Sequence, residues 1–316
     1  MPTKSRQLTK WSPTRIRTLE RCPRKHALRY IIARGAWPNG PRADEEHAVK
    51  AWEEMNWTPP DLMLCRLSVD GLKTWLSWCS QDRLFTPGRM ELWLRKALRE
   101  EMDSMPPHWA SDSTTEVHQD DDGLLEMLVH EGMRRMLAGR GQEYLAELAT
   151  SDVEWHLVPR FRAIEHSDAL LFAAPDLIRL EQEQVHLIQL CAQARRAEPS
   201  PSQKLELGAM LLWARSQEDL AIEPERFVIH RIAWVEDAWE HWSQPGSTRW
   251  RDQAATLVSC DLDALAKATS TQKLRSDEEL EGIGRAQSKT DCLSCGHAWR
   301  CPGPLRSGAQ RVDETA

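Results

Sequence analysis

Three cysteines lie close together near the end of the sequence, and they constrain the fold more than any other feature. Cys292, Cys295 and Cys301 form a C-x2-C-x5-C pattern, and the adjacent Gly296 and Pro302 favour the turns that direct thiolates toward one metal. Three ligands from one loop need a fourth. His297 would complete a zinc site. A cysteine ligand would have to come from the remaining five, among which spacing alone does not choose: Cys22, Cys65, Cys79, Cys191 and Cys260.

Length and composition indicate a globular protein. The 316 residues suffice for one large domain or two smaller ones. Hydrophobic residues at 41% and charged residues at 28% argue against wholesale disorder. No run approaches the roughly 18 apolar residues of a membrane span, and the opening MPTKSRQLTK lacks the apolar region of a secretory signal. We therefore expect a cytoplasmic protein with no membrane partner, a compartment that also disfavours disulfides.

Positive charge is concentrated at the N-terminus, although the net charge is -7. Within the first 35 residues Glu20 is the only acid, and it faces ten basic residues: Lys4, Arg6, Lys10, Arg15, Arg17, Arg21, Arg24, Lys25, Arg29 and Arg34. A surface that contacts phosphates explains this imbalance better than a solvated helix face. The 15 tryptophans are explained most simply as core residues, and exposed ones would be candidates for stacking on bases.

The periodicity of apolar residues predicts an α/β chain. Ser12 as N-cap and Pro13 at the first helical position predict a helix, which the Cys22-Pro23 pair interrupts before a second helix. Residues 105–123 are typical of a surface connection. Further helices are expected at residues 61–99, 124–139, 204–216 and 262–274. Strands are expected at residues 153–159, 169–173, 177–180, 185–190 and 226–234.

Two segments at opposite ends of the chain resemble one nuclease family. The run TKWSPTRIRTLERCPRKHALRYI is similar to the opening segment of the RecB-like branch of the PD-(D/E)xK nucleases, which reads Ser-Pro-Ser/Thr-Arg-Ile/Leu, a helix and then Cys-Pro. The C-terminal DCLSCGHAWRCPG is similar to the closing cluster of the same branch, found in the AddB-type helicase-nuclease subunit and in CRISPR-associated iron-sulfur exonucleases.

This resemblance implies a ligand set, a fold and a division of the chain. Cys22 would join Cys292, Cys295 and Cys301 around a 4Fe-4S cluster, for which four thiolates are the usual ligands. The fold would be restriction-endonuclease-like, a mixed central sheet flanked by helices. Four segments follow: a basic helical segment with the first cysteine ligand at 1–34, a helical insertion at 35–123, the PD-(D/E)xK-like core at 124–240, and a helical segment with the three-cysteine tail at 241–316.

The resemblance also implies where metal chemistry would lie. The family's core has a helix with an inward histidine, a strand with a metal-binding aspartate and a strand with Asp/Glu-x-Lys. Carboxylates there hold Mg or Mn against the scissile phosphate, and the lysine assists the attacking water. His130, in LLEMLVHEGM, and Asp176, in AAPDLIRL, resemble the first two positions. Read without the family, they would be a partly buried helix histidine and a capping aspartate.

The third position departs from the family pattern. The strand VHLIQLCAQ carries Gln189 and Cys191 where the family has an acid and a lysine. Neither side chain supplies the missing charge. Gln203 fits the start of the family's Gln-x-x-x-Tyr helix, and Lys204 and Glu206 beside it are candidates for a migrated catalytic pair, although such residues are more often a solvated helix face.

Three functions remain open from the sequence. The first is a DNA-binding pseudonuclease in repair, recombination or defence. The second is an active metal-dependent DNA exonuclease that acts on ends or single strands, and the third is a structural partner subunit without DNA contact. No G-x-x-x-x-G-K-S/T motif is present in the sequence, so any helicase activity would come from another protein subunit.

Overall fold

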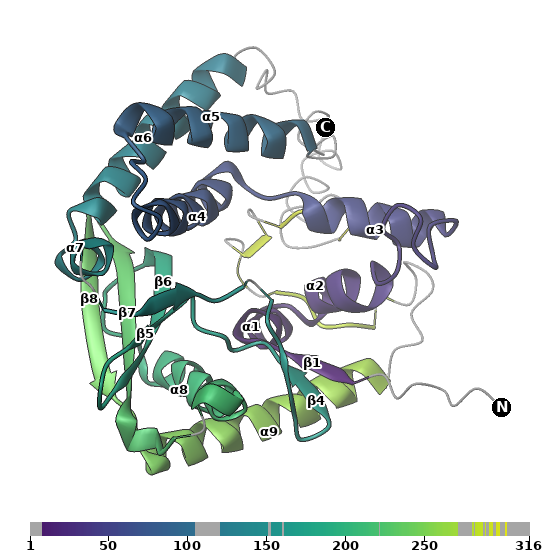
Figure 1. The fold of residues 1–316 in the computed structure, drawn as a ribbon. Coiled ribbons are helices and arrows are strands. Elements are labelled where there is room, and N and C mark those ends of the chain that lie inside the picture. The colour runs from purple at the N-terminus through teal and green to yellow at the C-terminus, as the bar shows by residue number, and fades with distance from the viewer. Residues whose placement is uncertain are drawn as a thin grey trace. The chain divides into compact units, whose positions relative to one another are not determined.

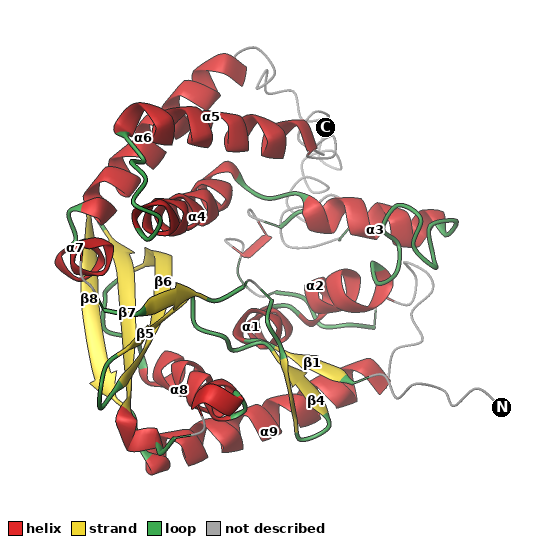
Figure 2. Cartoon of the chain, in the orientation of Figure 1, coloured by secondary structure: helices red, strands yellow, loops and turns green. Residues whose placement is uncertain are grey.

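The fold is α/β, as the sequence predicts (Figures 1 and 2). A computed structural model describes residues 8–104, 121–150, 153–159, 161–220 and 222–270, and in the C-terminal region residues 280, 282–286, 288, 291–292, 295–297 and 301. These residues form two compact units. The first unit holds residues 8–11, 60–103 and those described between 121 and 260, and the second unit holds 12–59, 104 and those described from 261 onward.

The first unit contains two β-sheets. The smaller sheet has the order β1-β4-β3, with β1 (Thr9–Trp11), β3 (Ile164–His166) and β4 (Ala169–Leu171). The larger sheet has the order β2-β5-β6-β7-β8, with β2 (Trp155–Leu157), β5 (Leu177–Leu180), β6 (Val185–Ala194), β7 (Phe227–Val235) and β8 (Ala238–Pro245). Strand β6 is antiparallel to β5 and parallel to β7, so the sheet is mixed.

Helices pack on both faces of the larger sheet. The helices of this unit are α4 (Pro60–Cys79), α5 (Pro87–Ser104), which packs against α4 and α6, then α6 (Asp121–Arg140), α7 (Glu143–Thr150), α8 (Pro201–Arg215) and the first part of α9 (Thr248–Ser270), with short turns η4 (Glu218–Leu220) and η5 (Pro224–Arg226). Trp239 of β8 donates to a carbonyl of α6, whereas Trp242 lies under Lys204 of α8. Side chains an odd number of positions apart on a strand point to opposite faces, so α6 and α8 cover different faces.

Helix α8 shows how local sequence determines an element. Ser200 and Gln203 form a reciprocal capping box, and Pro201 occupies the first turn, where its missing N–H is not needed. The helix then buries a continuous run from Leu207 to Ala214. Gly208 is required there, because a Cβ atom would lie 2.6 Å from the indole nitrogen of Trp250.

Three histidines form a hydrogen-bonded row across the face of the larger sheet that α7 covers. His186 Nδ1 lies 2.7 Å from His230 Nε2, and His230 Nδ1 lies 2.8 Å from His241 Nε2. Tyr144 of α7 stacks on the ring of His230 at a centroid distance of 4.7 Å and lies against the ring of His241 in a tilted arrangement at 4.8 Å. Burial lowers the pKa of His230 to about 3, and the neighbouring His186 and His241 contribute to this shift.

The second unit begins with the segment that contains Cys22. Its elements are α1 (Pro13–Arg21), α2 (Pro23–Ala27), η1 (Leu28–Ile32), α3 (Glu46–Asn56) and the end of α9. Ser12 Oγ accepts a hydrogen bond from the Arg15 amide at 3.2 Å, which is the expected N-cap. Cys22 then ends α1 in an extended conformation and caps α2.

Several elements differ from the sequence-based expectation. Helix α7 and strands β3 and β8 were not predicted, and β8 lies between the strand expected at residues 226–234 and the helix expected at residues 262–274. Strand β8 escapes notice because, as an edge strand, it exposes most of its residues and lacks a clear apolar pattern. Helix α9 begins at Thr248, well before the expected residue 262, and residues 271–274 lie outside the described part of the chain, as do residues 105–120 of the expected connection. None of the described helices has the length and apolar content needed to cross a bilayer.

Candidate functional site

The four cysteines that the family resemblance selects all lie in the second unit and interact electrostatically. Burial raises the pKa of the thiols of Cys292, Cys295 and Cys301, and the nearby Cys22 raises each of these three pKa values further. The hydrogen bond from Arg24, two residues after Cys22, to Cys301 Sγ places the two ends of the chain in one neighbourhood. Cys22 thus lies in the same part of the fold as the three C-terminal cysteines, from which most of the sequence separates it.

Basic residues of α2 surround these thiols. Arg24 is 1% exposed, and its guanidinium donates to Cys301 Sγ at 3.8 Å and to the Ile283 carbonyl at 3.1 Å. Burial is the main cause of the raised pKa of Cys301, and the hydrogen bond from Arg24 lowers that pKa in part. In the same way, the charge of Lys25 opposes the increase that burial causes in the pKa of Cys295. Positive charge beside thiols favours the thiolate form that binds metal. Arg24 therefore belongs to the cysteine site and not to an exposed phosphate-binding face.

A buried hydrogen bond attaches the cysteine loop to α3. His297 Nδ1 donates to Glu54 Oε2 at 2.7 Å, and both residues are buried. Burial lowers the pKa of His297, and Glu54 opposes that effect. His297, considered from the sequence as a zinc ligand, thus directs its Nδ1 atom to Glu54. The loop backbone is also held locally, since the Cys295 amide donates to the Cys292 carbonyl and the Cys301 amide to that of His297.

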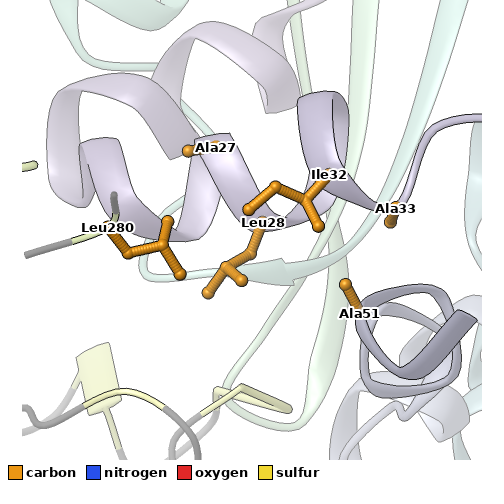
Figure 3. Close-up of a cluster of buried hydrophobic side chains, with 6 residues drawn as sticks. All are labelled: Ala27, Leu28, Ile32, Ala33, Ala51 and Leu280. Carbon is orange, nitrogen blue, oxygen red and sulfur yellow. The ribbon is translucent and has the colours of Figure 1, made fainter. Parts of the chain in front are cut away.

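Apolar packing holds the same two parts of the chain together. Leu280 packs against a buried cluster formed by Ala27, Leu28, Ile32, Ala33 and Ala51 (Figure 3). Ile283 adds a partly buried contact. Burial of a leucine stabilises a fold by about 1.5–3 kcal/mol. Apolar packing thus holds the segment before the cysteine loop against α2, η1 and α3.

The donor set fits an iron-sulfur cluster by its chemistry. Four thiols near cationic side chains match the all-cysteine ligation of 4Fe-4S clusters. Among the described residues, no group of three or more His, Cys, Asp or Glu side chains is arranged to hold a single metal ion. The cluster is therefore an inference from the donor set and the family resemblance, and the ligation itself is a proposal.

Gly296 offers a direct test of the loop geometry. A Cβ atom at this position would lie 2.2 Å from the Glu54 carbonyl oxygen, so Gly296→Ala must displace the loop from α3. We expect this variant to bind less iron per chain and to melt at a lower temperature than the parent. Gly282→Ala is the matched control, because a Cβ atom there would have no heavy atom within 4 Å. Equal iron content in the two variants would contradict the arrangement.

The catalytic candidates lie in the first unit, and Asp176 is central among them. It directly precedes β5, and its Oδ2 atom accepts a hydrogen bond from the Leu190 amide at 2.8 Å. Its other oxygen forms an ion pair with the ammonium group of Lys73 on α4. The carboxylate that would hold a divalent metal is thus engaged by a protein cation. Sequence patterns give no signal for Lys73, because it reaches Asp176 only through the packing of α4.

Strand β6 carries Gln189 and Cys191 beside this carboxylate. The Cys191 thiol donates to the Gln193 carbonyl at 3.3 Å and accepts from Arg231 Nη2 at 3.4 Å. Gln189 is the register partner of Arg231 on β7. Arg231 was not singled out from the sequence, although an arginine inside the apolar run of an expected strand was an available signal.

The candidates on α8 have separate roles. Gln203 Oε1 accepts from the Ser200 amide at 3.1 Å and from Arg231 Nη1 at 3.5 Å. Lys204 forms an ion pair with Glu198 at 2.7 Å and lies 5.4 Å from the ring centroid of Trp242. Glu206 is half-buried. Lys204 therefore has an acidic partner outside the Asp176 neighbourhood.

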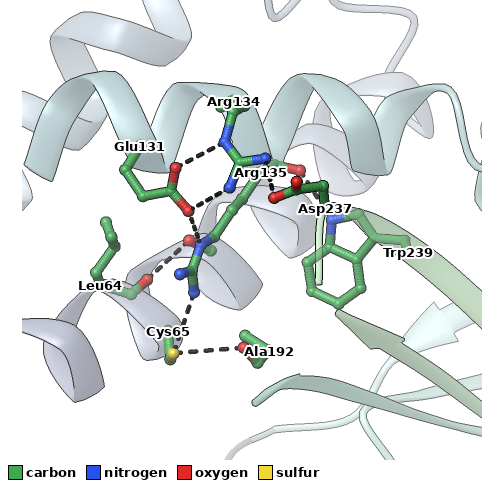
Figure 4. A network of polar contacts seen from close by, with 9 residues as sticks. Leu64, Cys65, Glu131, Arg134, Arg135, Ala192, Asp237 and Trp239 are labelled. Carbon is green, nitrogen blue, oxygen red and sulfur yellow. Dashed lines mark hydrogen bonds and ion pairs between the residues drawn. The ribbon is translucent and has the colours of Figure 1, made fainter. Parts of the chain in front are cut away.

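His130 is exposed on α6, in contrast to the inward position that the family resemblance implies. The next residue, Glu131, organises a polar network instead (Figure 4). Its carboxylate accepts from both Arg134 and Arg135, and the Arg134 hydrogen bond lowers the pKa of Glu131. Arg135 also donates to Cys65 Sγ at 3.2 Å. The network connects α6 to α4, and it does not include His130.

Comparisons with known proteins add little. No protein-family model matches the chain, and no curated protein matches it. One solved structure, described as the crystal structure of SSO0001, is 14% identical, with a TM-score of 0.27 over 75% of this chain and 94% of that chain. A TM-score this low supports no inference about fold or function.

Proposed function

We propose that this protein is a DNA-binding pseudonuclease of the RecB-like PD-(D/E)xK branch. In this proposal a 4Fe-4S cluster bound by Cys22, Cys292, Cys295 and Cys301 holds the second unit together. The protein would act in a repair, recombination or defence assembly in which any helicase is another subunit. The mixed sheet supports a restriction-endonuclease-like core, because the β5–β6 hairpin is followed by helix α8 and the parallel strand β7.

The main observation in favour of a protein without catalytic activity is that the Asp176 carboxylate is already paired. Its carboxylate pairs with Lys73, and the neighbouring strand supplies Gln189 and Cys191 instead of an acid and a lysine. Divalent metals in nucleases are held by several anionic oxygen ligands. A single carboxylate already neutralised by an ammonium group is a poor ligand for Mg or Mn.

The proposed DNA contact rests on the basic segment of the second unit. Arg21 and Arg34 are exposed, and Arg17, Lys25 and Arg29 are half-exposed. Each phosphate contact by such a residue releases counterions and makes binding sensitive to salt. The segment therefore provides a sequence-independent attraction for a nucleic-acid backbone.

Incubation of the anaerobically purified protein with end-labelled single- and double-stranded DNA in Mg or Mn tests the catalytic proposal. We expect no cutting by the parent protein. Lys73→Ala should also remain inactive, because Gln189 and Cys191 supply neither the second acid nor the ammonium group. Cutting by the parent that disappears in Asp176→Ala would establish an active exonuclease, and cutting gained by Lys73→Ala would show a nuclease inhibited by Lys73.

Fluorescence anisotropy over a series of salt concentrations tests DNA binding. The double variant Arg21→Ala/Arg34→Ala should reduce the slope of log affinity against log salt by about two, because each lost phosphate contact contributes about 0.9. Arg249→Ala, an exposed arginine on α9, is the control and should retain the parental slope. An absence of binding by the parent at low salt would favour the structural-subunit alternative.

A further inference from the structure

Arg231 is a buried cation whose contacts include no acidic partner. It is 5% exposed on β7, and its Nε atom has no hydrogen-bond partner. Its two terminal nitrogens donate to Gln203 Oε1 at 3.5 Å and to Cys191 Sγ at 3.4 Å. Neither of these acceptors belongs to an aspartate or a glutamate. Within the described chain the guanidinium therefore has no ion pair.

Such an arrangement is unfavourable for the isolated protein. A guanidinium keeps its charge in proteins, and buried charges are almost always paired with an anion. Burial of an unpaired charge destabilises a fold by far more than two long hydrogen bonds recover. The missing partner is accounted for if the site receives an anionic ligand, since a guanidinium binds phosphate and carboxylate oxygens well.

The residues around Arg231 specify the kind of anion. Trp242 is its register partner on β8, and the Lys204 ammonium lies over the Trp242 ring at 5.4 Å. Gln189 is its register partner on β6, and Gln203 belongs to the first turn of α8, where the positive end of the helix dipole lies. Cations next to an indole ring are the combination that single-strand binders use for phosphates and stacked bases.

We propose that Arg231, with Gln203, Lys204 and Trp242, forms a metal-independent site for a phosphodiester group of single-stranded nucleic acid. This site adds detail to the proposed function. The assignment of nucleic acid as its ligand rests on the proposal that the protein binds DNA. In it, a fixed protein cation replaces the divalent metal as the group that compensates the phosphate charge. Trp242 stacks on the adjoining base, and Lys204 exchanges its contact with Glu198 for the phosphate.

Gln203→Glu is the sharpest variant for a test. A glutamate retains the capping box with Ser200, since Glu and Gln both serve at this position. It also places a carboxylate against Arg231, which should occupy the guanidinium. The matched control is Gln142→Glu, the same change at the start of α7, where Gln142 Oε1 accepts from the Leu145 amide at 2.8 Å. Arg231→Met removes the cation itself and serves as a second variant.

The measurements are thermal unfolding in sodium phosphate against sodium chloride of equal ionic strength, and anisotropy with a labelled oligothymidylate. For the parent and Gln142→Glu we expect phosphate to raise the melting temperature through linkage. Gln203→Glu should melt higher than the parent without phosphate, should gain less from phosphate than the parent, and should bind the oligonucleotide at least tenfold more weakly. Arg231→Met should show the same reduced gain, since only the general stabilising effect of phosphate remains in both variants.

Two results would overturn the proposal, and they are distinguishable from failure of the proposed function. If the parent shows no phosphate response, or if Gln203→Glu binds the oligonucleotide as the parent does, Arg231 is not the phosphodiester site, and a DNA-binding pseudonuclease remains tenable through the basic segment. If phosphate stabilises the parent but no oligonucleotide binds at low salt, the assignment to nucleic acid fails together with the proposed DNA-binding function.

Discussion

We expect the anaerobically purified protein to absorb broadly at about 400 nm and to contain roughly four irons per chain. Cys295→Ser should lose this absorption and most of the iron. Cys295 is 8% exposed, and Cys22 and Cys301 are among the groups that raise the pKa of its thiol. A serine oxygen is a poor substitute for a thiolate as a ligand of iron. Iron and acid-labile sulfide contents, measured with the visible spectrum, provide the readout.

The matched control for this substitution is Cys260→Ser, which changes an exposed cysteine on α9. It should retain the colour and the iron of the parent. A colourless parent protein with one zinc per chain would contradict the iron-sulfur assignment. An unchanged iron content in Cys295→Ser would remove that residue from the ligand set, while leaving the assignment of the other three open to the same test.

Local signals in the sequence located much of the fold. The Ser12-Pro13 start of α1 and the break at Cys22 each depend on residues within one or two turns, and the structure contains both. Strand β8 and helix α7 were missed for a physical reason. An edge strand and a short helix bury few side chains, so their stability comes from neighbours distant in the sequence and leaves a weak periodic pattern.

The candidate sites show the same division between local and distant signals. The three C-terminal cysteines are visible as a spacing, whereas Cys22 could be selected only through the family resemblance. Lys73 has no local signature, because it becomes significant only through Asp176, which packing brings close. Arg231 stands out locally as an arginine in an apolar strand, but its contacts with Gln203 and Cys191 arise only from the fold. These two cations carry the functional argument. One occupies the carboxylate that a metal would need, and the other leaves a buried positive charge for an anion.

The histidine row should make the stability of the first unit dependent on pH. His230 has a pKa of about 3 in the folded state against an ordinary value of 6.5. As the pH falls below 6.5 the unfolded chain takes up a proton at this position, and the folded chain does not do so until about pH 3. The stability is therefore full above pH 6.5 and is lost progressively toward pH 3.

The size of the effect follows from the two pKa values. Between pH 8 and pH 5, His230 alone should lower the free energy of unfolding by about 2 kcal/mol. The charged and titratable groups around it are His186, His241, Tyr144, Arg179 and Glu181. The pKa values of His186 and His241 are also lowered by burial, so they act in the same direction, while Glu181 favours protonation of His186. Protonation of adjacent rings would place donors against each other in the row, which reinforces the loss.

Urea unfolding at a series of pH values, followed by tryptophan fluorescence, measures this dependence. His230→Gln removes the titrating group, so its free energy of unfolding should fall less between pH 8 and pH 5 than that of the parent, by about 2 kcal/mol. Ile232→Val is the comparison, because it removes a methyl group from a fully buried residue on the same strand. It should lower stability by about 0.5–1.5 kcal/mol equally at every pH. Identical pH profiles for His230→Gln and the parent would show that the histidine row does not control acid sensitivity. The Ile232→Val profile shows what a loss of stability without a change in proton binding looks like.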